Sequence, residues 1–263
     1  MTKKYFFFDI DGTLTDLRTH QIVPSAQKAI EKLKAAGHFV CLNTGRAHYK
    51  AEKTRIALHF DHMVCNGGNG IVIDGVFKEN EPLAKEKALA ILDEAKKKNI
   101  GYLIALNDSI EVYSEDDLFI SQVGFRKEPT RYIFDRNFDF HQVEHFYKIY
   151  LAIDEYKEKE FKTLSLLGSL RFEKEYLMFQ PDNKKGGIIK MMSWLQAPLS
   201  QVVVFGDDYN DLDMFDKNQW TCVAMGNACQ ALKDRATYVT SSNVDDGIYR
   251  ICQNMGWFEK IQK

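Results

Sequence analysis

The chain has 263 residues, of which 45% are hydrophobic and 27% are charged, and its formal net charge is −2. This length allows one large domain or two modest ones, and the composition is that of a folded chain with a substantial core, which excludes a disordered protein. The nearly balanced charge, without a long block of one sign, argues against a nucleic-acid partner.

The cysteines indicate a reducing compartment. Their number is odd and no two are spaced as CxxC, which argues against both a disulfide framework and a zinc site. They are Cys41, Cys65, Cys222, Cys229 and Cys252. The apolar run near the N-terminus is too short for a signal peptide or a membrane span. We therefore expect a cytoplasmic protein without a membrane partner.

The first 65 residues alternate between short buried strands and helices. The predicted strands are 5–10, 38–42 and 62–65. The predicted helices are 24–36, with a proline near its start and a glycine just after its end, and 46–58. This alternation of strand and helix predicts a parallel α/β sheet.

The pattern changes after residue 65. The segment NGGNGIVIDG (66–75) is rich in glycine and then alternates, which is typical of a hairpin. Helices are predicted at 82–98 and 155–167, with a polar helical stretch from residue 115. Strands are predicted at 102–106, 111–113, 149–153, 169–172 and 176–179. Neighbouring strand pairs with helices between them predict a two-layer α/β arrangement with an antiparallel sheet.

The first pattern returns after residue 181. Helices are predicted at 186–195, 210–215 and 247–255, and strands at 201–205, 221–224 and 238–240. The sequence therefore predicts a discontinuous α/β core domain with a parallel central sheet, formed by 1–80 and 183–263. The inserted α/β domain is predicted at 81–182, a plausible size for an independent module.

Two carboxylates follow the first predicted strand, in YFFFDIDGTLTD (5–16). Asp9 and Asp11 repel each other unless a cation lies between them. Ligands of open parallel sheets bind beyond the carboxyl ends of the strands, and Mg²⁺ prefers oxygen ligands. Two acids at a strand end can also simply cap the following turn, so the pair alone does not decide between these interpretations.

Three further segments add to this pair. A buried strand runs into several acids and an amide in VVVFGDDYNDLDMF (202–215), and LNTGR (42–46) places Thr44 at a predicted helix start, where free amides bind phosphate. The pair Lys184–Lys185 precedes Gly186 at another helix start. Together, these strand ends and helix starts predict a site for phosphate and Mg²⁺.

Four motifs, FFFDIDGTLTD, LNTGR, NKKGG and VVVFGDDYNDLDMF, resemble those of the haloacid dehalogenase superfamily of phosphohydrolases. The insertion between the second and third motifs resembles the α/β cap of the Cof-type sugar-phosphatase subfamily, as do NGG (66–68), VAMGNA (223–228) and VTSSNVDDG (239–247). The resemblance covers the whole chain. It implies a Rossmann-like core, an inserted cap that selects the substrate, and a Mg²⁺-dependent phosphatase for small phosphorylated metabolites, with sugar phosphates as the first expectation.

The resemblance also implies catalytic and metal-binding roles. Asp9 would be the nucleophile that forms an aspartyl-phosphate, and Asp11 would be the general acid and then the general base. Mg²⁺ would be held by Asp9, by the main-chain carbonyl of Asp11 and by Asp207.

The phosphate-binding residues implied by the resemblance are Thr44, the amide of Gly45, Lys185 and Asn210, and Asn210 would orient either the phosphate or a water on the metal. The family lysine usually stands directly before the glycine that opens the helix, which favours Lys185 over Lys184. Asp211 is expected behind these groups, holding Lys185 or a water on the metal. Arg46 either reaches the substrate or closes the helix start.

Two other functions remain open at this point. A phosphosugar mutase or another phosphotransferase would use the same site and pass the phosphoryl group to a sugar hydroxyl. A phospho-ligand binding protein without turnover would be expected to lack the nucleophile or the acid, whereas Asp9, Asp11, Lys185 and Asp207 are all present. A monomer and a homodimer are both compatible with the sequence.

Overall fold

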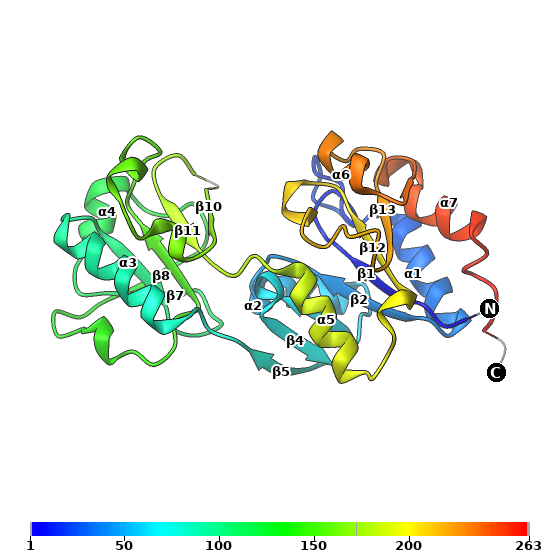
Figure 1. The fold of residues 1–263 in the computed structure, drawn as a ribbon, viewed down its shortest axis with the longest axis horizontal. Helices are drawn as coiled ribbons and strands as arrows, with labels where there is room; N and C mark the ends of the chain where they lie inside the picture. The colour runs from blue at the N-terminus through cyan, green and yellow to red at the C-terminus, as the bar shows by residue number, and fades with distance from the viewer. Residues whose placement is uncertain (1, 172, 262–263) are drawn as a thin grey trace. The chain divides into compact units, whose positions relative to one another are not determined.

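The structure is a computed structural model that describes residues 2–171 and 173–261. The chain divides into two compact units, one formed by Met1–Asn80 with Asn183–Lys263 and the other by Glu81–Asp182. In Figure 1 the first unit combines blue and cyan segments with yellow, orange and red ones, so the two ends of the chain share one unit. The second unit is built from the middle of the chain alone.

The first unit contains an eight-stranded sheet in the order β14-β13-β12-β1-β2-β3-β4-β5. The strands are β1 (Tyr5–Phe8), β2 (Phe39–Asn43), β3 (His62–Cys65), β4 (Gly70–Ile73), β5 (Val76–Asn80), β12 (Val202–Gly206), β13 (Thr221–Ala224) and β14 (Tyr238–Val239). Every neighbouring pair from β14 to β3 is parallel, and β4 and β5 join as antiparallel strands. The predicted parallel central sheet is thus confirmed.

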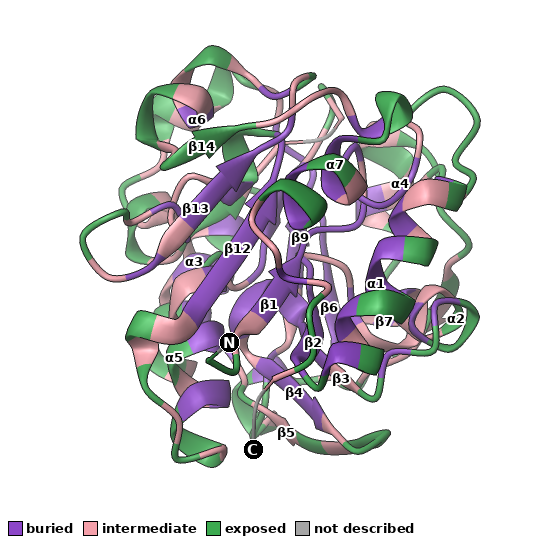
Figure 2. Ribbon diagram, turned by 90° about the vertical axis from the view of Figure 1, so that its right-hand side faces the viewer, coloured by how far each residue is buried: buried purple, intermediate pink, exposed green. Residues whose placement is uncertain are grey.

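Helices cover both faces of this sheet. They are α1 (Pro24–Ala36), α2 (His48–Ala57), α5 (Lys184–Trp194), α6 (Gln230–Arg235) and α7 (Gly247–Asn254). Phe6 and Phe8 pack into one core with α1, α2 and α7, whereas Phe7 points to the other face and packs with α5 and α6. Figure 2 shows β1, β12 and β13 largely in the purple of buried residues. The aromatic run Tyr5–Phe8 therefore has apolar side chains on both faces of the sheet, because helices cover both faces.

The second unit contains a six-stranded sheet in the order β10-β11-β9-β6-β7-β8. Its elements are α3 (Lys85–Lys97), β6 (Tyr102–Ala105), β7 (Glu111–Ser114), α4 (Leu118–Val123), β8 (Arg131–Phe134), β9 (Lys148–Leu151), β10 (Ser169–Leu170) and β11 (Leu177–Phe179). All neighbouring strands are antiparallel except β7 and β8, which are parallel. The predicted class, a parallel α/β core with an inserted α/β unit, is confirmed, with this one parallel pair as a difference.

The helix predicted at 155–167 is wrong. This segment forms only two short 3-10 turns, Lys157–Glu160 and Leu164–Leu166. Glu94 on α3 accepts hydrogen bonds from the backbone amides of Lys162 and Thr163, so these amides bind a side chain of another element instead of continuing a helix. The helix predicted at 210–215 is likewise a 3-10 turn, Tyr209–Asp211.

Other differences are smaller. The strand β8 was not predicted, and the predicted strand 169–172 extends to residue 172, which lies outside the described residues. All five cysteines are free thiols. Among the described residues, no helix combines the length and apolar character needed to cross a membrane.

A buried histidine links the two ends of the chain in the first unit. The amide of Lys4 donates to Nδ1 of His38 at 3.0 Å, and Nε2 lies 3.0 Å from the carbonyl of Trp257, so Nε2 carries the proton of a neutral ring. Burial lowers the pKa of His38, although the bond to Trp257 opposes this effect. The neutral ring is thus the form that the fold stabilises.

We predict a pH-dependent contribution of His38 to stability. Because its folded pKa lies below the unfolded value of about 6.5, its stabilisation is complete above that value and is lost as the pH falls. The difference in unfolding free energy between wild type and H38Q, measured in urea, should therefore be larger at pH 8 than at pH 5.5. H145Q, which removes an exposed histidine, is the control, and a pH-independent difference would contradict the prediction.

Candidate active site

Two acids lie together at the carboxyl ends of adjacent parallel strands. Phe8 of β1 is in register with Phe205 of β12, and the amide of Asp9 donates to the carbonyl of Phe205 at 3.0 Å. Asp9 directly follows β1 and Asp207 directly follows β12. The parallel register thus brings residues almost 200 positions apart to one edge of the sheet.

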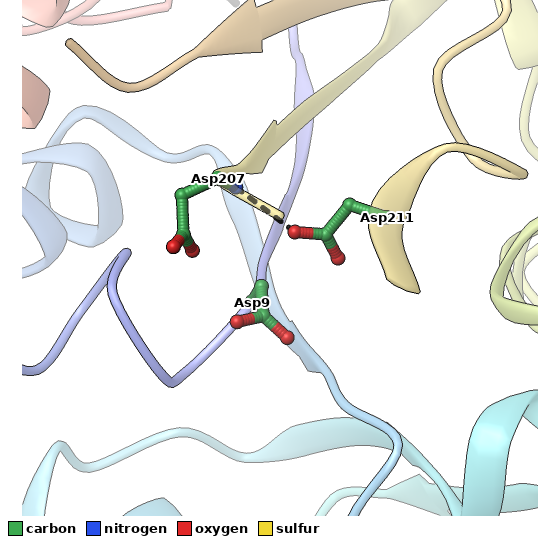
Figure 3. Close-up of side chains that lie close together, drawn as sticks. All are labelled: Asp9, Asp207 and Asp211. Atoms are coloured by element: carbon green, nitrogen blue, oxygen red, sulfur yellow. Dashed lines mark hydrogen bonds between the residues drawn. The ribbon is translucent and has the colours of Figure 1, made fainter. Parts of the chain in front are cut away.

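Asp211 completes a buried acidic cluster with these two residues. The exposed fractions are 4% for Asp9, 5% for Asp207 and 0% for Asp211, and one carboxylate oxygen of each lies within 4.8 Å of the others. Figure 3 shows the three side chains close together, with the amide of Asp207 donating to Asp211 at 2.9 Å. Three buried carboxylates need a nearby positive charge.

Lys184 supplies one positive charge to this cluster. Its Nζ lies 2.7 Å from Oδ1 of Asp9 and 2.6 Å from Oδ1 of Asp211, and the residue is only 1% exposed. Lys185, the predicted lysine, instead forms an ion pair at 2.8 Å with Asp216. The choice of Lys185 is therefore corrected: Lys184 is the lysine that the structure places beside Asp9.

Helix periodicity explains this arrangement. The buried face of α5 contains Lys184, Gly187, Ile188, Met191 and Met192. Lys184 thus stands four residues before one apolar residue and seven before another, which is the spacing of a helical stripe facing the core. The sequence already contained this spacing of Lys184 from the apolar residues of α5. The position of Lys185 next to Gly186 did not identify the buried lysine.

Burial is also the main influence on the charges of the cluster. It raises the pKa of Asp9 to about 7, against the opposing effect of Lys184, and raises the pKa of Asp207 to about 8, with the charge of Asp9 adding to the effect. Burial opposes the charge of Lys184, but Asp211 and Asp9 outweigh it and raise the lysine pKa. The raised pKa values of the two acids mean that one lysine does not balance three buried carboxyl groups, so a proton or a further cation is favoured at this position.

The donor set at this edge fits a hard divalent cation. Both oxygens of Asp211 are already engaged, Oδ1 by Lys184 and Oδ2 by the amides of Asp207 and Asp208. Asp9 and Asp207 are therefore the better side-chain candidates for a metal ligand. Two carboxylates with additional water or phosphate oxygens suit Mg²⁺.

Asp11 lies at the exposed side of this edge and is paired with Arg46. The guanidinium binds both carboxylate oxygens, with Nε 2.9 Å from Oδ2 and Nη2 2.5 Å from Oδ1. The side chains of Asp11 and Arg46 are 42% and 36% exposed, respectively. Neither predicted role of Arg46, reaching the substrate or closing the helix start, included this contact with Asp11.

Thr44 lies at the end of β2, next to Gly45 and Arg46. It is 2% exposed, and its hydroxyl accepts from the amide of Arg46 at 3.1 Å. The helix that follows begins at His48, two residues later than predicted, so Gly45 belongs to the turn and not to the first helical residues. Asn210 is exposed on the turn that ends at Asp211.

The loop after Asp11 supports Asp207 directly. Gly12 has a φ of 80°, and a Cβ at this position would overlap the carboxylate of Asp207, so only glycine fits here. The hydroxyl of Thr13 donates to Oδ1 of Asp207 at 2.8 Å. Thr13 was not among the predicted site residues, although the sequence places it two residues after Asp11.

Comparison with known proteins agrees with this arrangement. The sequence model of a haloacid dehalogenase-like hydrolase family matches residues 6–251. The pyridoxal phosphate phosphatase YbhA of Escherichia coli (strain K12) is 28% identical over 269 residues, which cover 94% of this chain and 97% of that protein. Phosphoglycolate phosphatase 1 of Saccharolobus solfataricus is 25% identical over 267 residues, covering 98% and 99%.

The fold has a counterpart among solved structures. The sugar phosphatase BT4131, described as a member of HAD subclass IIB, superposes with a TM-score of 0.72 at 22% identity, covering 97% of this chain and 100% of that one. At this identity the likeness concerns the fold, including the inserted unit.

An α/β core with an inserted α/β unit and a lysine-bridged acidic cluster at its strand ends defines a haloacid dehalogenase-type enzyme. The chain belongs to the haloacid dehalogenase-like hydrolase family. The predictions of the family and of a hydrolase are thus confirmed.

We predict different effects for the two neighbouring lysines. K184M leaves Asp9 and Asp211 as buried carboxylates without their cation, so it should lower the unfolding free energy by about 3–5 kcal/mol and abolish hydrolysis of p-nitrophenyl phosphate. K185M removes only the partly exposed pair with Asp216, which is worth about 0–1 kcal/mol, and should keep most of the activity. An inactive K185M beside an active K184M would reverse this assignment.

Proposed function

We propose that the protein is a Mg²⁺-dependent phosphatase that hydrolyses small phosphorylated metabolites through an aspartyl-phosphate. One observation carries this proposal: the buried contact of Lys184 with Asp9 at 2.7 Å, at the strand end where Asp207 also lies. A carboxylate that is oriented by a lysine and adjoins a second acid is suited to nucleophilic attack on a phosphate ester. Membership of the family and the phosphatase names of its relatives support the same activity.

In the first step, a carboxylate oxygen of Asp9 forms a bond to phosphorus while the bond from phosphorus to the ester oxygen breaks. Asp11 donates a proton to the departing alkoxide, which leaves as an alcohol. Lys184 keeps Asp9 in place and compensates for part of the negative charge that gathers as the dianionic phosphate approaches. The contact through Oδ1 holds one of the two oxygens of Asp9.

In the second step, water attacks the phosphorus of the aspartyl-phosphate. Asp11, now ionised, accepts the proton of this water, and the bond between phosphorus and Asp9 breaks to release inorganic phosphate and the free carboxylate. Arg46 lies in contact with Asp11 and would turn its carboxylate toward the reacting oxygen. Both steps use the same carboxylate for proton transfer in opposite directions.

Other residues of the first unit would hold the phosphoryl group and the metal. Thr44, the amide of Gly45 and Asn210 are proposed to bind phosphoryl oxygens, with Lys184 in place of Lys185. Asp9, the main-chain carbonyl of Asp11 and Asp207 would hold Mg²⁺, with Asp211 behind them. When bound, Mg²⁺ would offset the repulsion between the carboxylates and the phosphate.

Small phosphorylated metabolites are the proposed substrates, with sugar phosphates first. The named relatives act on pyridoxal phosphate and phosphoglycolate, and the structural neighbour is a sugar phosphatase, so a phosphate monoester on a small polar molecule is the chemistry they share.

The five free thiols support the proposal of a cytoplasmic protein.

We predict that the two acids at the first strand end differ in the step that they serve. With p-nitrophenyl [³²P]phosphate, D9N should neither turn over nor become labelled, because the amide is no nucleophile. D11N should turn over slowly and accumulate the labelled protein, because this activated ester needs little help to leave but water still needs a base. Labelling of D9N would rule out the proposed covalent route, and circular dichroism verifies that both variants fold.

We also predict the substrate class. In the presence of Mg²⁺, kcat/KM should be highest for sugar phosphates among a panel that includes pyridoxal phosphate and phosphoglycolate, and chelation of the metal should abolish turnover of all of them. Free phosphate and sugar phosphate isomers are measured in the same reactions. Conversion of a sugar 1-phosphate to its 6-phosphate without release of phosphate would instead identify a mutase.

A further inference from the structure

Two asparagines hold the loop that follows Asp11. The amide of Asn227 donates to the carbonyl of Gly12 at 2.9 Å, and the amide of Asn243 donates to the carbonyl of Thr15 at 2.8 Å. The two asparagines are also linked, because the backbone amide of Asn243 donates to Oδ1 of Asn227 at 3.0 Å. Together they fasten both ends of the segment from Gly12 to Thr15.

This segment is in direct contact with Asp207. Gly12 packs so closely against the carboxylate of Asp207 that a side chain would overlap it, and the hydroxyl of Thr13 donates to Oδ1. A shift of the loop would therefore move or release this carboxylate. The chain of contacts runs from Asn243 to Asn227, then to Gly12 and finally to Asp207.

The asparagine segments are themselves held beside Asp207. Gly226 donates its amide to the carbonyl of Ser241 at 2.9 Å, and a Cβ on Gly226 would overlap the backbone of Ser242. The amide of Cys229 donates to the main-chain carbonyl of Asp207 at 2.8 Å. The two segments, VAMGNA (223–228) and VTSSNVDDG (239–247), thus pack closely against each other outside the acidic cluster.

We propose that Asn227 and Asn243 are positioning residues that set the geometry of the metal site through the Gly12–Thr15 loop. The inference rests on the proposed Mg²⁺ site. Mg²⁺ demands near-ideal octahedral geometry, so a displaced carboxylate costs affinity. Neither asparagine belongs to the ligands or to the reacting groups, and each acts on Asp207 through the backbone of the loop.

Asn227 offers the sharper test of the two. It is exposed, so its truncation removes little buried surface, whereas Asn243 is 5% exposed and its loss also affects packing. A purely structural role of Asn227 would change the unfolding free energy but not the metal affinity of the folded protein. A positioning role changes the metal affinity of a protein that remains folded.

The experiment measures binding of Mn²⁺, used as a paramagnetic substitute for Mg²⁺, to the full chain without substrate. The free ion is followed by electron paramagnetic resonance, since Mn²⁺ suits the same oxygen ligands. We expect N227A to bind Mn²⁺ about 3- to 10-fold more weakly than wild type, because it loses the hydrogen bond to the carbonyl of Gly12. The bond that Asn227 accepts from the amide of Asn243 is lost as well, which acts in the same direction. N243A should weaken binding in the same direction, because it releases the other end of the loop.

N218A is the matched control, because Asn218 is an exposed asparagine of the same unit whose backbone amide, not its side chain, binds Asp216. N218A should bind Mn²⁺ as wild type does. Equal Mn²⁺ affinity of N227A, N218A and wild type would overturn the inference and leave the metal site intact. Urea titrations verify that each of the three proteins is folded in the absence of denaturant. A wild-type protein without Mn²⁺ or Mg²⁺ binding would overturn both the metal site and the inference.

Discussion

The contact of a fully buried lysine with two buried carboxylates is the interaction on which the rest of this site depends. Lys184 is 1% exposed and bridges Asp9 and Asp211, which come from the two ends of the chain. Buried charges are costly unless they are paired and hydrogen-bonded. The pairing therefore explains how the fold tolerates acids at the end of its most apolar strand.

The excess of carboxylates over this lysine gives the site its chemical character. Asp207 stands beside the pair with a pKa raised by burial, so the cluster favours a further cation. The surrounding backbone leaves little freedom to this arrangement: Gly12 allows close approach, Thr13 donates a hydrogen bond, and two asparagines fasten the loop. Charge and backbone contacts thus act together to hold the carboxylates and the lysine at one edge of the sheet, where we propose that a phosphate and a metal bind.

The sequence predicted the fold well where periodicity had a single meaning. The aromatic run ending at Phe8 and the valine-rich run after Gln201 are short and apolar, and both form buried parallel strands. The failures occur where another element takes the hydrogen bonds. Residues 155–167 have a helical composition, but Glu94 binds two of their amides, so no helix forms. Composition alone does not reveal such a partner, because it lies about 70 residues away.

The same distinction applies to the site. The residue types at the strand ends, Asp9, Asp11 and Asp207, follow from the motifs because parallel strands of alternating α/β segments share one carboxyl edge. Which lysine faces the acids depends on the rotation of α5 against the sheet, since its buried stripe contains Lys184 and not Lys185. The pairing of Arg46 with Asp11 and the fastening of the loop by Asn227 likewise join residues distant in the sequence. Local pattern thus specifies which chemical groups are present, and only packing in three dimensions selects the partners that orient them.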